Sequence, residues 1–209
     1  MTHNSEGKDS SGAHLRDEVA EIVRDGREVA KRITSLIQRA ITEGSGTLVG
    51  LPGILASVVE GALKGVVSSA PGEQRERLEA VLIQLEEVFV SILNAIHLTV
   101  KEAAARGERV AGEEVRGFAS ELFSLAQLFG EIVSQYAGQF SSEARVQASD
   151  LRVHFGRIAM KIAPLVQALV LAAVEIPQAV AAQAVSTTSS WLARALRRAA
   201  DRLDGEQKE

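Results

Sequence analysis

The stretch "GTLVGLPGILASVVEGALKGVV", residues 46–67, is strongly apolar, yet it contains five glycines and a proline. From residue 53 onward, small residues recur every four positions, as Gly53, Ser57, Gly61, Gly65 and Ser69. This spacing places them on one face of an α-helix, where the backbone of another helix can approach closely. Each interior glycine costs about 1 kcal/mol relative to alanine, so packing must hold such a helix together. The sequence therefore predicts a helix from about Pro52 to Ser68 whose small face, starting with Gly53, Ser57, Gly61 and Gly65, packs on a neighbouring helix.

The other faces of this helix are apolar, apart from Glu60 and Lys64, which are spaced to pair with each other. Its candidate contacts with an apolar surface are Leu51, Ile54, Leu55, Val58 and Val59. The uncharged run Thr47–Val59 has 13 residues, and the run Ile162–Val174 has the same length. A membrane-spanning helix needs about 20 apolar residues, so these runs favour packing or shallow insertion over spanning.

From Leu15 onward, apolar residues recur in steps of four and three, as they do in amphipathic helices. The first row of these apolar residues, which we call a seam, begins at Leu15 and continues through the position of Gly26 without interruption. The expected helices cover residues 15–40, 52–68, about 71–107, 111–136, 144–172 and 177–203. Ser141 or Ser142 is placed to cap the fifth helix, and Pro164 should kink it. The sequence predicts an all-α fold, an elongated bundle of about six long amphipathic helices with coiled-coil-like packing.

The two ends of the chain are polar. Residues 1–13 are expected to form a disordered tail, and residues 205–209 a second polar tail. Residues 14–204 form the predicted single domain, with a potential subdivision near residues 70–72, where the proline and glycine lie.

Composition excludes several kinds of site. The chain of 209 residues has no cysteine, which rules out disulfides, thiolate zinc sites and cysteine nucleophiles. A net charge of −4 gives no basic footprint for nucleic acid. His97 and His154 lie on different predicted helices, and neither has the i+3 or i+4 partner of a metal site. We expect a protein that is not an enzyme, with no catalytic residues, metal or cofactor.

Arginines gather near the C-terminus, at Arg194, Arg197, Arg198 and Arg202. They follow Trp191 and Leu192, which are candidate apolar-surface contacts together with Leu165 and Leu169. A tryptophan beside an arginine-rich helix face suits the headgroup zone of a lipid surface, so the arginines are candidate headgroup contacts. The pattern favours the plainer alternative, a solvated terminal helix whose dipole is complemented by the same cations.

Long, cysteine-free, alanine-rich amphipathic helices dominate the region from about Glu73 to Leu203, with passages such as "ELFSLAQLFGEIVSQYAGQFSSEARVQASDLR". This texture resembles the phasins of bacterial polyhydroxyalkanoate granules. The resemblance implies a non-enzymatic coat on a hydrophobic inclusion, with no catalytic residues to carry over. The glycine-rich helix near residue 60 departs from that pattern.

The predicted helices offer more apolar surface than one narrow seam requires, most clearly over 52–68, 71–107 and Ile162–Val185. We therefore expect a protein that coats a storage granule, a lipid droplet or a membrane surface and associates with itself. Its location would be cytoplasmic, or peripheral on a membrane or inclusion. One alternative is a homo-oligomeric scaffold that binds a protein partner. A further alternative is a membrane-active, toxin-like helical protein.

Overall fold

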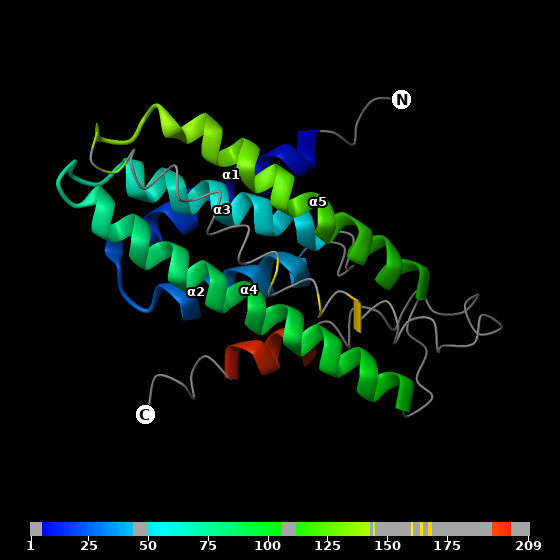
Figure 1. The fold of residues 1–209 in the computed structure, drawn as a ribbon. Helices are drawn as coiled ribbons and strands as arrows, with labels where there is room; N and C mark the ends of the chain where they lie inside the picture. The colour runs from blue at the N-terminus through cyan, green and yellow to red at the C-terminus, as the bar shows by residue number, and fades with distance from the viewer. Residues whose placement is uncertain are drawn as a thin grey trace.

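The computed structural model describes residues 6–43, 50–105, 112–142, 144, 160, 164, 167–168 and 194–201. Its helices are α1 (Glu6–Asp25), α2 (Val29–Glu43), α3 (Leu51–Val67), α4 (Gln74–Ala105) and α5 (Gly112–Ala137) (Figure 1). Residues 194–201 are helical as well and are named the terminal helix. No strand occurs in these ranges. The predicted all-α class is confirmed.

Three predicted helices agree closely with the structure. The helices expected over 52–68, 71–107 and 111–136 correspond to α3, α4 and α5. Most of the predicted fifth and sixth helices, and the kink expected at Pro164, lie outside the described residues. Ser141 does act as a cap, because the amide of Ala144 donates to its Oγ at 3.3 Å.

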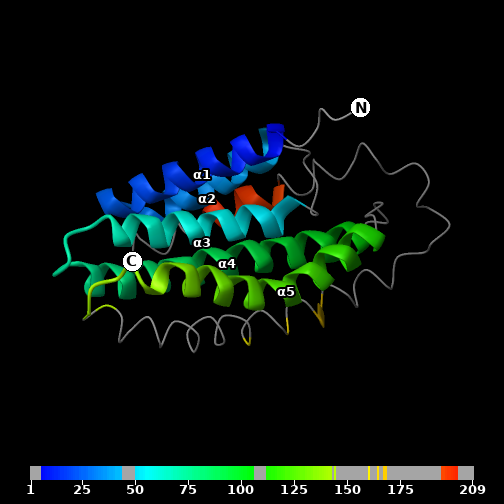
Figure 2. The same ribbon diagram turned by 90° about the horizontal axis from the view of Figure 1, so that it is seen from above.

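Among the helices α1 to α5, the glycine-rich α3 contacts each of the other four. α1 and α3 run parallel, since Arg16 lies against Gly61 and Ala20 lies against Gly65. α2 folds back antiparallel on α1, where Arg39 pairs with Glu18. Seen from above, α1 and α2 lie on one side of α3, and α4 and α5 lie on the other (Figure 2). The segment that looked least regular in sequence is therefore the centre of the packing.

The prediction of one helix over 15–40 is wrong, because the chain turns between α1 and α2. Gly26 has a φ of +71°, and Glu28 has a positive φ of 44°. The amide of Gly26 donates to the carbonyl of Ile22 at 3.0 Å, which is the bond of a left-handed helix C-cap. The apolar seam continues past this turn because α2 folds back and buries its apolar face, including Val29 and Ile33, in the same core.

α1 begins at Glu6, whereas a disordered tail was expected up to residue 13. The early turns extend the helix alongside α3, where a β-carbon on Gly12 would lie 3.6 Å from Ser57 Oγ. Packing against α3 thus stabilises a helix that this polar sequence would not be expected to form by itself.

A buried amide ties the α3–α4 turn to the end of α5. The Gln74 side chain is only 4% exposed, and its Nε2 donates to the carbonyls of Val67 at 3.0 Å and Ser69 at 3.3 Å. Its Oε1 accepts the amide of Ser141 at 2.8 Å. These bonds satisfy a polar group that would otherwise be costly to bury, and they fix three chain segments at one end of the molecule.

α4, with 32 residues, is the longest of the helices α1 to α5. Its Phe89 ring stacks on Phe129 of α5, with centroids 5.7 Å apart and planes at 21°. Residues Gln74–Glu102 form one helix long and apolar enough to cross a membrane by length and composition. Within its most apolar window, 56% is buried inside the molecule, as also happens in core helices.

Candidate functional site

The α1–α3 contact is closest at two glycines. A β-carbon on Gly61 would lie 2.5 Å from the carbonyl oxygen of Arg16 and 2.9 Å from Val19 Cβ. One on Gly65 would lie 2.8 Å from the carbonyl oxygen of Ala20. Only hydrogen fits at either position. The structure thus places these two residues of the predicted stripe directly against a neighbouring helix.

Gly53 and Ser57, which also belong to the predicted stripe, lie nearer the N-terminal end of α3. Ser57 is half-buried opposite Gly12. Gly53 is exposed, and a β-carbon there would meet no atom within 4 Å. The close contact therefore begins beyond Gly53, in the second half of α3.

Ion pairs join α1 and α3 beside the glycines. Arg16 Nη1 donates to Glu60 Oε2 at 2.8 Å, and Lys64 Nζ donates to Asp17 Oδ1 at 2.7 Å. Glu60 and Lys64 thus pair with α1 and not with each other, which corrects the expected i,i+4 pair. The hydrogen bond from Lys64 lowers the pKa of Asp17, and the same bond raises the pKa of Lys64. The charges fix the register of two helices whose contact surface is otherwise smooth.

Tyr136 of α5 borders this charged group from the other side of α3. Its ring is partly buried, and burial raises the pKa of its hydroxyl, with a further contribution from the Glu60 carboxylate. The sequence contains no other tyrosine. This hydroxyl is therefore an internal reporter of how α5 packs near α3.

Most residues of α3 that were predicted to contact an apolar surface are inside the protein. Leu51, Leu55, Val58 and Val59 are at most 1% exposed, and Ile54 is half-buried. In this conformation they contact other helices, because α3 is surrounded. Candidates that lie outside the described residues are Leu165, Leu169, Trp191, Leu192 and Arg202.

Two of the large apolar residues that the described part of the chain exposes are on α4 instead. Ile83 is 62% exposed and Leu98 is 50% exposed, and half-buried Val90 lies between them. Steps of seven and eight residues place all three on one side of a helix, with the polar residues Glu87 and Asn94 between them on the same side, so we name the three apolar residues the outer stripe. Sequence reasoning missed it by following the seam through Leu82 and Phe89. The available signal was that α4 is apolar on more than one face, which marks a helix with an additional contact.

Three of the four candidate headgroup arginines are on the terminal helix, and all three are exposed. Arg198 Nη2 donates to Glu102 Oε2 of α4 at 2.8 Å, and this hydrogen bond raises the pKa of Arg198. Arg197 has no hydrogen-bond or ion-pair partner among the described residues. The terminal helix thus exposes its arginines to solvent, and one of them, Arg198, also forms an ion pair with α4.

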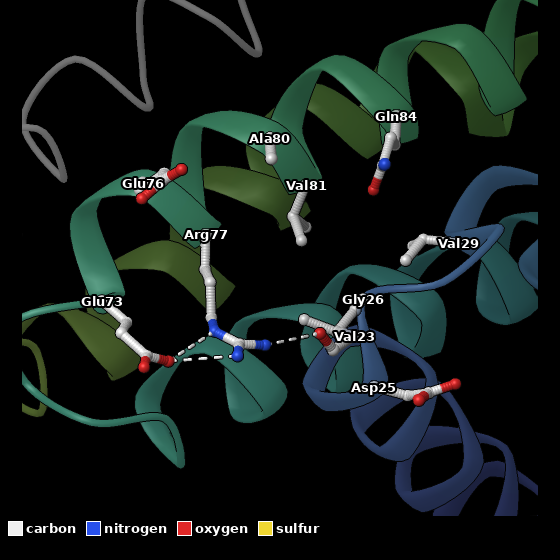
Figure 3. A pocket seen from close by; sticks show the side chains of 10 residues that line it. All are labelled: Val23, Asp25, Gly26, Val29, Glu73, Glu76, Arg77, Ala80, Val81 and Gln84. Atoms are coloured by element: carbon white, nitrogen blue, oxygen red, sulfur yellow. Dashed lines mark hydrogen bonds and ion pairs between the residues drawn. The ribbon is translucent and has the colours of Figure 1, made fainter.

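A hollow of about 380 Å³ lies between the end of α1 and the first turns of α4 (Figure 3). Arg77 reaches across it, donating to Glu73 Oε2 at 3.1 Å and to the carbonyls of Arg24 at 2.7 Å and Val23 at 3.3 Å. Its guanidinium therefore caps the C-terminal end of α1. The ten lining residues include no histidine, serine, threonine or lysine, so the hollow offers no nucleophile paired with a base. Among the described residues no cluster of three metal-ligating side chains occurs.

These features define an all-α protein with a glycine-packed central helix and an outward apolar stripe. The sequence profile of the Family of unknown function (DUF6781) matches residues 5–204. The chain belongs to this family. Comparison with curated proteins and with solved structures finds no match.

Proposed function

We propose that the protein is a non-enzymatic helical protein that associates with a hydrophobic surface, such as a storage granule, a lipid droplet or the face of a membrane. The observation that carries this proposal is the outer stripe of α4, where Ile83 is 62% and Leu98 is 50% exposed. Large apolar side chains in water gain free energy when a surface covers them. The resemblance to phasins points to the same class of surface.

The geometry of the outer stripe favours binding parallel to a surface. From Ile83 to Leu98 the stripe is about 22 Å long, at 1.5 Å per residue. The opposite side of α4, including Leu85, Phe89 and Ile92, is fully buried against the rest of the protein. A helix held in this way can place one face in the boundary of a lipid layer while its other face stays packed.

We also propose that the helices form one elongated bundle with coiled-coil-like packing. Its support is the four-three spacing of the apolar seams and the parallel and antiparallel neighbours of α3. Small-angle scattering should give the extended distance distribution of a rod-like particle. A distribution typical of a sphere would contradict the elongated shape.

Flotation tests the surface proposal. The protein is mixed with triolein droplets coated with phospholipid, over a series of lipid loadings, and centrifuged through a density gradient. We expect it to rise with the droplets in proportion to their surface, as a protein with an outward apolar stripe should. Recovery entirely in the soluble fraction at every loading would remove the proposal.

The alternative function is a self-associating scaffold, and the same outer stripe favours it, since a second copy could cover Ile83 and Leu98. Native mass spectrometry distinguishes the self-associating scaffold from the surface-associating protein. A stable oligomer that loses its subunit contacts in an Ile83→Gln/Leu98→Gln variant, together with no flotation, would favour the scaffold. A monomer at micromolar concentration would leave surface association as the explanation. In either case we propose a cytoplasmic location, peripheral where the surface is a membrane or an inclusion.

A further inference from the structure

The side of α4 that carries the outer stripe has a regular spacing along most of the helix. Steps of four and three residues connect positions that are all exposed or half-buried: Glu76, Ala80, Ile83, Glu87, Val90, Asn94, His97 and Lys101. We name these residues the outer row. The same spacing occurs where two helices pair side by side at a shallow angle, as in a coiled coil. The outer row therefore has the geometry of a surface that receives another helix.

Polar side chains interrupt the apolar ones in this row. Glu87 and Asn94 are half-buried and lie between the residues of the outer stripe, and the carboxamide of Asn94 has no hydrogen-bond partner among the described residues. A purely apolar cover would remove water from both groups without replacing its hydrogen bonds, which is costly. A partner that covers the whole row must therefore bring polar groups that match a carboxylate and an amide.

Charge is distributed unevenly along the outward side of α4. Its first half carries the carboxylates of Glu79 and Glu87, and its second half carries the exposed ammonium group of Lys101. Lys101 forms no ion pair with any residue that the structure describes. Glu102, beside it, is already paired with Arg198 of the terminal helix. A partner of complementary charge would be cationic opposite the first half and acidic opposite the second.

A second copy of the same helix meets these requirements when it runs antiparallel. With a two-fold axis beside Val90, residues at equal distances on either side of the axis lie opposite each other. Ile83 of one copy then lies opposite Leu98 of the other, because these residues are seven and eight positions from Val90. The large exposed apolar residues of α4 thus cover each other twice, once on each side of the axis.

The same register pairs the polar groups. Glu87 of one copy lies opposite Asn94 of the other, whose amide group can donate to a carboxylate that accepts from several donors. Lys101 lies opposite Ala80, next to Glu79, so its ammonium group meets the acidic half of the other helix. A parallel copy would instead place Glu87 against Glu87 and Lys101 against Lys101, which is unfavourable. The outer row is therefore complementary to itself in one direction only.

We infer that a second copy of this chain covers the outer row in the absence of an apolar surface, with the two α4 helices antiparallel about an axis beside Val90. The pair must open before the outer stripe can contact a droplet, because the same side chains make both contacts. The inference rests on the proposed function, since it names the partner that a hydrophobic surface has to replace.

Sedimentation velocity over a concentration series tests the pairing of the full chain. We expect a reversible equilibrium between monomer and dimer, and a monomer at every concentration for Ile83→Gln/Leu98→Gln. Because both residues are exposed, the variant should be as helical as the wild type, which circular dichroism checks. A wild-type protein that stays monomeric throughout the series overturns the inference.

Pulsed electron paramagnetic resonance measures the orientation of the two copies. The chain has no cysteine, so one nitroxide can be attached at Arg75→Cys or at Ala105→Cys, exposed positions near the two ends of α4. Each lies about 15 residues from the axis, so antiparallel copies should place equivalent labels about 45 Å apart, at 1.5 Å per residue. A parallel pair, with helix axes about 8–10 Å apart, would give distances below about 25 Å at both positions and would overturn the inference.

Charge reversal tests the contact of Lys101. Lys101→Glu should raise the dissociation constant of the dimer about tenfold, because it brings like charges together at two symmetric sites. Adding Glu79→Lys should restore the wild-type value, since the pair is then present with its signs exchanged. Arg27→Glu, at an exposed arginine of the α1–α2 turn, changes the net charge equally and should shift nothing. Equal effects of Lys101→Glu and Arg27→Glu, or no recovery in the double variant, would overturn the register.

Asn94→Leu distinguishes a second copy from a lipid layer as the occupant of the row. The change removes the donor to Glu87 and should weaken the dimer. It also extends the outer stripe, and should therefore strengthen binding to phospholipid-coated triolein droplets. A dimer that becomes tighter would contradict the polar pairing.

Flotation of the nitroxide-labelled protein on the same droplets separates this inference from the proposed function. Protein that floats but is monomeric in solution refutes the pairing and leaves surface association intact. Protein that forms the antiparallel dimer but stays in the soluble fraction at every droplet loading refutes surface association and leaves the pairing intact. Protein that floats with the antiparallel distance retained refutes the opening of the pair. Protein that loses this distance as it floats supports both.

Discussion

Replacing Gly61 by alanine adds one methyl group at the closest point between α1 and α3. In an isolated helix this change is favourable by about 1 kcal/mol, because alanine has the higher helix propensity. In the folded protein the new β-carbon would lie 2.5 Å from the carbonyl oxygen of Arg16, well inside the 3.4 Å at which ordinary contact begins. The oxygen belongs to the backbone of a helix, so a side-chain rotation cannot relieve the overlap.

The two helices must therefore separate, and the net effect should be destabilising. Overpacking a core costs about 1–3 kcal/mol, and contact with backbone places Gly61→Ala at the upper end of that range. Subtracting the gain in propensity leaves a loss of about 2 kcal/mol. In a chain of this size that corresponds to a melting temperature lower by about 4–8 °C.

Urea unfolding followed by circular dichroism measures this loss. Gly130→Ala in α5 is the matched control, because a β-carbon there meets no atom within 4 Å. The control should be neutral or stabilising by up to about 1 kcal/mol. If Gly61→Ala stabilises the protein as much as Gly130→Ala does, then α1 and α3 do not approach in the way described, and the reasoning fails.

Three further outcomes follow from the packing of the described helices. Tyr136, the single tyrosine, should ionise above pH 10 in the native protein, because burial raises its pKa, and the stability linked to this shift is present below about pH 10 and lost as pH rises through the folded pKa. Absorbance at 295 nm checks this, and a midpoint equal to that in urea would contradict it. Asp17→Asn should lower the urea midpoint slightly at neutral pH, and the difference should vanish as pH falls below about 4, since Lys64 lowers the pKa of Asp17 and the pair is lost on protonation; a difference independent of pH would contradict it. Ser91→Leu should displace the terminal helix, because the Ser91 hydroxyl donates to the carbonyl of Ala199, and should speed tryptic cleavage after Arg197 and Arg198; unchanged cleavage would show that Ser91 does not pack closely on this helix.

The centre of the fold could be predicted from the sequence. Steps of four between small residues placed Gly61 and Gly65 on one helix face, and the physical argument that such a face seeks another backbone applies in any fold. The same spacing could not show that the contact begins only beyond Gly53. That limit depends on where α1 lies, which is a property of the whole arrangement.

The turn between α1 and α2 could not be predicted from periodicity. Gly26 occupies a seam position, and Val29 continues the seam because both helices bury the same side in one core. Two consecutive helices that fold back on each other in this way keep the apolar period across the turn between them. The positive φ values of Gly26, +71°, and of Glu28, 44°, distinguish the turn from a continuous helix.

The candidate site was predicted less well than the fold. Apolar character alone nominated Leu55 and Val58, which the structure buries, because hydropathy does not distinguish a residue that faces the core from one that faces a ligand surface. Ile83 and Leu98 are no more apolar than these residues, and their exposure depends on which side of α4 packs against the other helices.

The most direct test of surface association compares droplet affinity between two double variants. Ile83→Gln/Leu98→Gln removes the outer stripe, and Leu128→Gln/Met160→Gln removes two exposed apolar residues elsewhere, which are 37% and 69% exposed. Burying a whole leucine or isoleucine contributes about 1.5–3 kcal/mol, so the exposed portions of Ile83 and Leu98 should together supply about 2 kcal/mol. We predict that the first variant binds phospholipid-coated triolein droplets about thirtyfold more weakly than the wild type, and that the second binds within about threefold of it. Equal affinity of the first variant and the wild type would contradict the assignment of α4 as the surface-binding helix.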